Sequence, residues 1–291
     1  HRSMGMKNIN LLSSVFLCAS LLCGPVGAAC AQTNAASPSD SLMGRYLARV
    51  TATQSEQPHW ITPLVTVTPR LEQEFRTDFV HQDDTQAYGQ WNYGNGKGLE
   101  FIPQKQVEML VNLPPFVAHD HPGVQDGFGD VSLMMKYRIF AHNEETGNSI
   151  ITAFLSGSIP TGKNGNGSCC AIVTPTLAMG KGFGRFDYTT TIGGSLPVTN
   201  AAKLGHTITW NNAWQYKIGR LFWPELESNT NFYRSGANDG KVQSFLTPGI
   251  VMGRFPLHNR IGLTVGAGEQ IAVTRFHTYN HSLVLTARMP F

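Results

Sequence analysis

The residues best placed to do chemistry are charged side chains that recur at every second position. In residues 70–80, Glu72, Glu74, Arg76 and Asp78 alternate with leucine and phenylalanine. Successive side chains of a β-strand point to opposite faces, so this segment would present charge on one side and hydrocarbon on the other. Charges of both signs that share a face can pair or line a polar passage. The pattern therefore predicts a polar lining rather than a catalytic centre.

The same alternation recurs along the chain and yields a set of candidates for that lining. The candidates are Glu72, Glu74, Arg76, Asp78, Glu108, Asp130, Lys136, Arg138, Glu225, Glu227, Asn229, Arg254 and Arg288. Two interpretations stay open, namely a lining that controls passage and a water-poor interior crosslinked by salt bridges. Asp130 with Lys136 or Arg138 is a candidate internal ion pair.

Other clusters of chemically active residues are weaker. His119-Asp120-His121 has metal-ligand residue types, but a His-x-His motif on a loop is more often solvated, so we predict no metal site. The adjacent Cys169 and Cys170 form either a strained vicinal disulfide or two thiols without function. The glycine-rich residues 93–98 lack the strand-to-helix context of a phosphate loop, so we expect no nucleotide and no other cofactor.

The composition excludes several classes of protein. The 291 residues carry 22 Lys and Arg against 19 Asp and Glu, for a formal net charge of +3. Charged residues are only 14% of the chain, too few for a coiled coil or an acidic disordered protein. The small net charge gives no electrostatic footprint for nucleic acid, so we expect no nucleic-acid partner.

The first residues predict export. Residues 1–31 combine a tag or start remnant with a secretory signal, whose apolar run spans residues 11–23. Two processing routes stay open, cleavage before Gln32 and lipidation at Cys30. Residues 32–62 are rich in Ala, Ser, Thr and Gln and predict a mostly flexible periplasmic lead-in.

The alternating segments after the lead-in predict a membrane barrel over residues 63–291. No run there approaches 18 apolar residues, so a membrane-spanning form must be a closed barrel. We predict an all-β, antiparallel up-and-down transmembrane barrel of about 12 strands, with long and short connections alternating. A soluble periplasmic β-sandwich is the alternative fold. The expected strands cover about 64–80, 97–103, 105–113, 128–140, 149–160, 172–180, 185–197, 206–218, 222–233, 242–254, 260–271 and 279–291.

The last predicted strand indicates the membrane concerned. Apolar residues alternate there up to a terminal aromatic residue, which is the pattern that outer-membrane barrels present to their assembly machinery. We therefore expect the outer membrane of a Gram-negative bacterium, with outer-membrane lipid and the barrel-assembly machinery as partners. The residues of this expected assembly signal are Leu283, Leu285, Ala287, Met289 and Phe291.

Four motifs support a family resemblance. Residues 127–139 are GFGDVSLMMKYRI, 156–163 are SGSIPTGK, 224–229 are PELESN and 246–253 are LTPGIVMG. Their sequence, order and spacing resemble the family known as MetA-pathway of phenol degradation, which includes transporter-like outer-membrane barrels. The resemblance implies a barrel that moves hydrophobic or aromatic compounds, and it fixes no particular substrate.

Three functional hypotheses follow. The leading one is a transporter or channel for a small-molecule solute, and we expect no enzyme activity. The second is a barrel enzyme, a lipid hydrolase or a protease, with His119, Asp120, His121, Asp126 and Ser168 as candidates that match no recognisable catalytic motif. The third is a structural barrel that conducts nothing.

Overall fold

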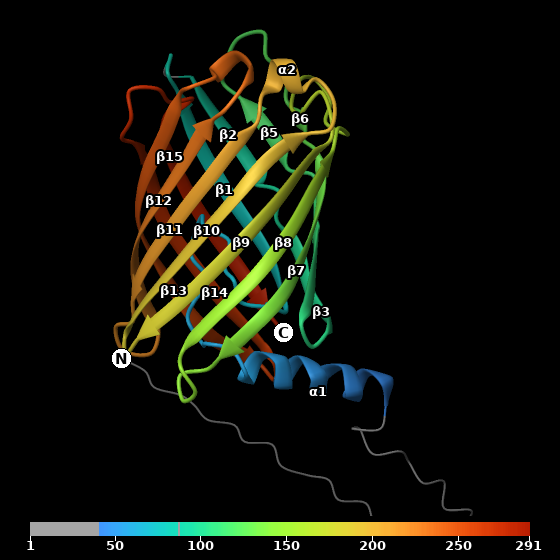
Figure 1. Ribbon diagram of the computed structural model, residues 1–291, viewed down its shortest axis with the longest axis vertical. Coiled ribbons are helices and arrows are strands. Elements are labelled where there is room, and N and C mark those ends of the chain that lie inside the picture. The colour runs from blue at the N-terminus through green and yellow to red at the C-terminus, as the bar shows by residue number, and fades with distance from the viewer. Residues whose placement is uncertain (1–40, 87) are drawn as a thin grey trace, which may run out of the picture. The chain divides into compact units, whose positions relative to one another are not determined.

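A closed antiparallel β-barrel makes up most of the computed structural model, which describes residues 41–86 and 88–291. The strands form one sheet that closes where β15 pairs with β1, giving a barrel of 12 wall strands (Figure 1). The predicted fold class is confirmed. The predicted signal and residues 32–40 of the expected lead-in lie outside the described residues.

Three wall strands consist of two segments each, and the other nine are continuous. The segments in chain order are β1 (Glu74–Asp84), β2 (Gly89–Gly94), β3 (Gly98–Gln104), β4 (Val107–Asn112), β5 (Phe116–His119), β6 (Gly127–Phe128), β7 (Val131–His142), β8 (Ser149–Ile159), β9 (Ile172–Phe183), β10 (Phe186–Pro197), β11 (Thr207–Tyr216), β12 (Phe222–Tyr233), β13 (Val242–His258), β14 (Ile261–Ala272) and β15 (Tyr279–Pro290).

The interrupted strands differ from the prediction. Residues 81–96 were expected to be a loop, but they contain the end of β1 and all of β2, and β5 lies in the next expected loop. The breaks have local causes. Asn95 and Gly96 adopt positive φ between β2 and β3, and Pro114 and Pro115 lack the N–H groups that a ladder needs between β4 and β5. The wall strands are therefore longer than the alternation alone suggested.

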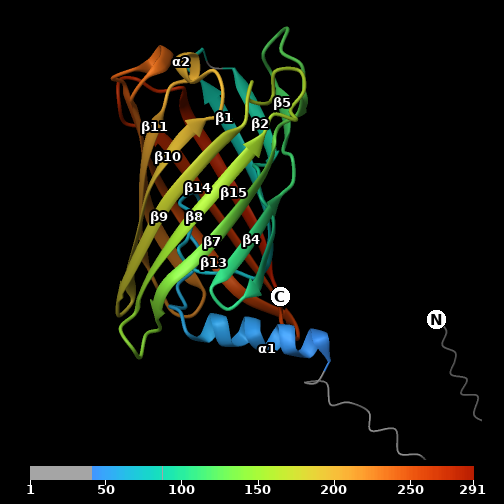
Figure 2. The same ribbon diagram turned by 45° about the vertical axis from the view of Figure 1, so that its right-hand side comes forward.

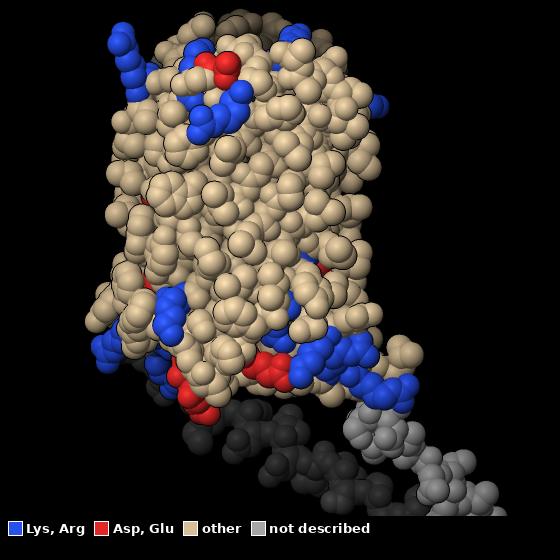
Figure 3. All heavy atoms as spheres, in the orientation of Figure 1, with Lys and Arg blue, Asp and Glu red and all other residues tan. Residues whose placement is uncertain are grey.

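The outer surface is apolar between two polar ends. In β15, Leu283 and Met289 are exposed whereas the intervening Val284, Thr286 and Arg288 are buried. Figure 3 shows Lys, Arg, Asp and Glu gathered toward the two ends of the barrel, with a zone of other residues between them. This is the alternation of apolar outside and polar inside that membrane barrels require.

A helix, α1 (Leu42–Ser55), lies across one end of the barrel, where the expected lead-in had been assigned no structure (Figures 1 and 2). Its start is capped because the Ser41 side chain accepts a hydrogen bond from Gly44 N at 2.9 Å. Its other end is fixed because Arg138 Nη1 donates to Thr53 O at 2.8 Å.

No helix in the described part of the chain is long and apolar enough to cross a membrane. We call the end of the barrel where α1 lies the α1 end and the opposite one the loop end.

Residues 57–73, the luminal segment, run inside the barrel. The strand predicted over 64–80 begins only at Glu74, so the expectation for residues 64–73 was wrong. Pro63 and Pro69 supply no N–H to a ladder, which disfavours a wall strand here, although β9, β12 and β13 each tolerate a proline. The segment therefore leaves the wall and crosses the lumen, where Leu64 and Leu71 are buried.

Glycines in the wall make room for the luminal segment. A Cβ atom added at Gly268 of β14 would lie 2.6 Å from Leu64 Cδ1, and one added at Gly249 of β13 would lie 2.4 Å from the same atom. A Cβ at Gly180 of β9 would lie 2.5 Å from the Trp60 ring. Trp60 and Leu64 thus sit against bare backbone, because any larger residue would occupy their space.

We predict that Gly268→Ala destabilises the barrel, because the added methyl group and Leu64 cannot share one position. Overpacking of this kind costs about 1–3 kcal/mol. The measurement is the temperature at which the protein loses its heat-modifiable migration on a gel. Gly194→Ala is the control, because its nearest non-neighbour atom would lie 3.9 Å from the new Cβ. Equal melting temperatures for the two variants would contradict the close contact between Leu64 and Gly268.

Candidate functional site

Carboxylates of β12 hold the first half of the luminal segment by its backbone. Glu225 Oε1 accepts a hydrogen bond from Leu64 N at 3.0 Å. Glu227 accepts from Val65 N at 2.8 Å and from Thr66 N at 2.6 Å. An irregular segment inside a barrel has no ladder neighbour, so its N–H groups need side-chain acceptors. Two neighbouring inward positions of one strand provide them.

Arginines hold the carbonyl groups of the same stretch. Arg76 Nη2 donates to Leu64 O at 2.5 Å, and Arg288 donates to the carbonyl oxygens of Thr62 and Pro63. Arg76 also forms a two-pronged contact with Asp78, at 2.8 and 2.9 Å. The planar guanidinium donates several hydrogen bonds in fixed directions, which suits two backbone carbonyls at once.

The second half of the luminal segment is held from the opposite side of the lumen. Lys136 Nζ lies 2.9 Å from Glu108 Oε1 and 3.3 Å from Arg70 O. Glu108 Oε2 in turn accepts from Glu72 N at 2.5 Å. Gln57 folds the segment back on itself, because its amide bonds to both the N–H and the C=O of Leu71, at 2.9 and 2.8 Å.

Most of the predicted lining residues are almost fully buried and point into the lumen or its ends. The buried ones are Glu72, Glu74, Arg76, Asp78, Glu108, Lys136, Arg138, Glu225, Glu227 and Arg288, whereas Asn229 and Asp130 are half-buried and Arg254 is exposed. Three of them lie elsewhere than the alternation suggested. Glu72 belongs to the luminal segment, Asp130 to the loop end and Arg254 to the rim of the α1 end.

The ion pairs also differ from those expected by proximity in sequence. Lys136 pairs with Glu108 of the neighbouring strand, and Arg138 pairs with Glu56 after α1 at 3.2 Å. Asp130 accepts instead from Gly162 N at 2.8 Å and Ser168 N at 2.7 Å, so it orders the loop between β8 and β9. The expectation that Asp130 pairs with Lys136 or Arg138 was wrong, because a strand rises about 3.3 Å per residue and so places Lys136 and Arg138 roughly 20 Å or more along the chain from Asp130.

Sequence reasoning missed the neutral partners of the luminal segment. Gln57, Thr62 and Thr152 are all buried, and Thr152 Oγ1 donates to Pro69 O at 2.6 Å. Thr62 Oγ1 donates to Glu72 Oε1 at 3.0 Å. The available signal was the pair of prolines at 63 and 69, two breaks of a possible ladder within seven residues, whereas β9 and β12 each contain a single proline and the two prolines of β13 lie further apart.

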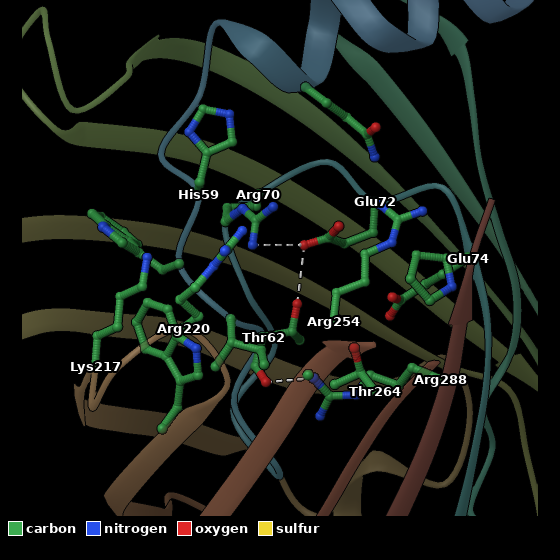
Figure 4. Close-up of a pocket in the computed structure, with 16 residues that line it drawn as sticks. His59, Thr62, Arg70, Glu72, Glu74, Lys217, Arg220, Arg254, Thr264 and Arg288 are labelled. Carbon is green, nitrogen blue, oxygen red and sulfur yellow. Dashed lines mark hydrogen bonds and ion pairs between the residues drawn. The ribbon is translucent and has the colours of Figure 1, made fainter. Parts of the chain in front are cut away.

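A cavity of about 270 Å³, the α1-end cavity, lies on one side of the luminal segment (Figure 4). Arg70, Lys217, Arg220, Arg254 and Arg288 outnumber Glu72 and Glu74 in its lining. Arg70 Nη1 lies 3.3 Å from Glu72 Oε1, as the dashed line in Figure 4 marks. The excess of cationic side chains makes this cavity attractive to anions.

A second cavity of about 380 Å³, the loop-end cavity, lies on the other side of the segment. Leu64, Val65 and Val67 of the luminal segment form part of its lining. Its wall is rich in side-chain amides, namely those of Gln82, Asn95, Asn211, Asn229, Asn231, Gln243 and Gln270. The luminal segment thus separates a cation-rich cavity from an amide-rich one within a single polar lumen.

A contact at the α1 end ties down the start of the luminal segment. Glu144, in the turn between β7 and β8, accepts hydrogen bonds from His59 N at 2.6 Å and from the His59 side chain at 2.7 Å. Burial raises the pKa of the Glu144 carboxyl, but these hydrogen bonds outweigh it and hold that pKa below its ordinary value. Glu144 therefore stays ionised and keeps the contact near neutral pH.

The residues considered for metal binding or catalysis take part in loop structure. His119 N donates to Asp126 Oδ1 at 2.8 Å, and the His119 ring contacts Asn166 Oδ1 at 2.6 Å. His121 contacts the carbonyl of Pro122 at 2.8 Å. In residues 41–86 and 88–291, no group of three or more His, Cys, Asp or Glu is arranged to hold a metal ion. Cys169 and Cys170 are free thiols with their sulfur atoms 3.7 Å apart.

Comparisons with known proteins identify the fold. No protein-family model and no curated protein matches the chain. The chain is similar to a solved structure described as "Crystal structure of the COG4313 outer membrane channel from Pseudomonas putida F1", with a TM-score of 0.54 and 13% identity over 80% of this chain and 100% of that chain. A second, described as "Unveiling the Mechanism Behind the in-meso Crystallization of Membrane Proteins", has a TM-score of 0.42 and 9% identity over 75% of this chain and 84% of that one. The first similarity shows a shared barrel fold, and membership of the family suggested by the four motifs stays a prediction.

We predict that Glu227→Gln destabilises the barrel far more than Glu269→Gln. Glu227 is fully buried and accepts from two backbone amides, whereas Glu269 is exposed and pairs with His281 at 3.3 Å. Loss of hydrogen bonds to a buried charge costs about 1.5–3 kcal/mol, and an exposed ion pair contributes under about 1 kcal/mol. Urea unfolding in lipid vesicles, followed by tryptophan fluorescence, measures both. Similar losses of unfolding free energy in the two variants would show that Glu227 does not anchor the luminal segment.

Proposed function

We propose that the chain is a channel of the Gram-negative outer membrane whose passage is closed at rest by the luminal segment. The observation that carries the proposal is the pair of cavities on the two sides of that segment, inside one polar lumen. The apolar band outside the barrel supports contact with outer-membrane lipid, and the barrel-assembly machinery is the matching partner. Longer connections at one end, such as residues 160–171, support an extracellular loop end.

The solute class is a finer proposal. The four motifs, through their family resemblance, support hydrophobic or aromatic small molecules. The excess of Arg and Lys in the α1-end cavity supports a preference for anions among charged solutes. The proposal includes no catalysis and no cofactor, and the loop contacts of His119 and Ser168 support a structural role for the former catalytic candidates.

A barrel without conduction is the second candidate, because the luminal segment is bonded to the wall along its length. To distinguish a barrel without conduction from a channel, the same barrel must be compared in a closed and in an opened form. Glu227→Gln loosens the segment without changing the volume of any side chain, and Glu269→Gln removes one charge outside the lumen.

We predict that planar bilayers containing the wild-type protein show low, intermittent ion conductance, and that Glu227→Gln raises the open fraction by roughly tenfold, which corresponds to a change of about 1.4 kcal/mol between the closed and open states. Glu269→Gln should behave as the wild type. Heat-modifiable migration verifies that each inserted protein is folded. The channel proposal fails if all three folded proteins carry no ions and pass no benzoate into liposomes.

We further predict that Arg254→Gln shifts the reversal potential toward cations, because it removes a positive side chain from the α1-end cavity. Lys241→Gln, at the loop end, is the control. The measurement is the reversal potential under a salt gradient. Identical shifts for both variants would contradict a selectivity set by the α1-end cavity.

A further inference from the structure

The loop-end cavity is lined by polar side chains, and several of them take no part in holding the luminal segment. Its volume of about 380 Å³ lies within the range of small-molecule pockets. Asp78 and Lys97 are its charged lining residues, and their formal charges are opposite and cancel. The remaining polar lining consists of neutral amides and hydroxyls. Such a wall favours a solute without net charge.

A chain of hydrogen bonds orients several of these amides. Tyr279 OH donates to Gln270 Oε1 at 2.8 Å, and Gln270 Nε2 donates to Asn229 Oδ1 at 3.2 Å. Asn229 Nδ2 then donates to Thr66 Oγ1 of the luminal segment at 3.3 Å. Each amide carries two N–H donors, and each uses one in this chain. The orientation of the amides is therefore fixed while donors remain for a ligand.

Other polar groups in the cavity have no partner in the described part of the chain. No hydrogen bond there involves the side chain of Asn231, which is half-buried and lines the cavity, or that of Thr209 beside it. A hydrocarbon solute would displace water from these groups and give them nothing to bond. A hydroxyl group both donates and accepts, so it can pair with either end of an amide.

Two stacked aromatic rings also form part of the cavity lining. The rings of Phe245 and Tyr279 stack with centroids 4.2 Å apart and an angle of 10° between their planes, and both residues line the cavity. An aromatic face next to directed amides matches a ring that is apolar on its C–H face and polar at its edge. The pyranose ring of a sugar has this arrangement.

We propose that the loop-end cavity binds a neutral, hydroxyl-rich small molecule of the mono- or disaccharide class. The role of this cavity as an entry site for a transported solute rests on the proposed channel function. A saccharide is a different class of solute from the hydrophobic compounds that the family resemblance suggests. Binding itself requires no conduction, so it can be tested on the closed barrel.

The test is isothermal titration of the purified full chain in lauryldimethylamine oxide, because maltoside detergents would compete for the site. Glucose and maltose are the probes, and benzoate is the aromatic comparison. We expect saturable binding of at least one saccharide. Asn231→Leu and Gln270→Leu should each weaken it roughly tenfold, as the loss of a ligand hydrogen bond does. Gln106→Leu, an exposed amide at the α1 end, should leave it unchanged.

Asn231→Leu keeps the experiment interpretable, because the wild-type Asn231 side chain makes no described hydrogen bond that the variant would lose. The proposal is overturned if neither saccharide binds, if benzoate alone binds, or if both cavity variants bind the saccharide as tightly as the wild-type protein does. Saccharide binding without conductance would overturn the proposed function and leave this inference standing. Conductance without saccharide binding would overturn this inference and leave the proposed channel function standing.

Discussion

The structure depends on the need of the luminal segment for hydrogen-bond partners. A chain that crosses a barrel interior has no ladder neighbour, and each buried N–H or C=O left unpaired is costly. Glu225 and Glu227 accept hydrogen bonds from the N–H groups of the segment, whereas Arg76 and Arg288 donate to its carbonyl oxygens. The buried charges are therefore retained because they hold a peptide segment, and their removal would leave both partners unsatisfied.

The neighbouring features follow from that constraint. Wall strands carry glycine where Trp60 and Leu64 approach, because the segment needs space as well as partners. The helix α1 fixes the start of the segment at one end of the barrel, through Arg138 and Thr53. The two cavities are what remains of the lumen on either side. Their different linings, cationic at the α1 end and amide-rich at the loop end, make the segment a boundary between two chemical environments.

Alternation in the sequence was sufficient to predict the barrel, its strand number and the burial of most charged positions, because a period of two is a property of each strand alone. The same pattern misplaced Glu72, since an alternating segment that lies beside the wall resembles one that lies in it. The partner of Lys136 could not be predicted, because cross-strand register is set by the closed sheet, and those of Asp130 could not, because they are backbone N–H groups of the folded loop between β8 and β9. Helix α1 was not predicted, because Ser41 marks only its start, whereas its other end is fixed by a contact with Arg138 that exists only in the closed barrel.

The most direct test of the account is amide hydrogen exchange of the wild-type protein, resolved for residues 64–66. These amides lie outside the strands, yet their partners are buried carboxylates. We predict protection of these amides close to that of the neighbouring strands, because exchange requires the luminal segment to leave its anchors. Exchange as fast as that of the loop between β8 and β9 would contradict a segment held inside the barrel.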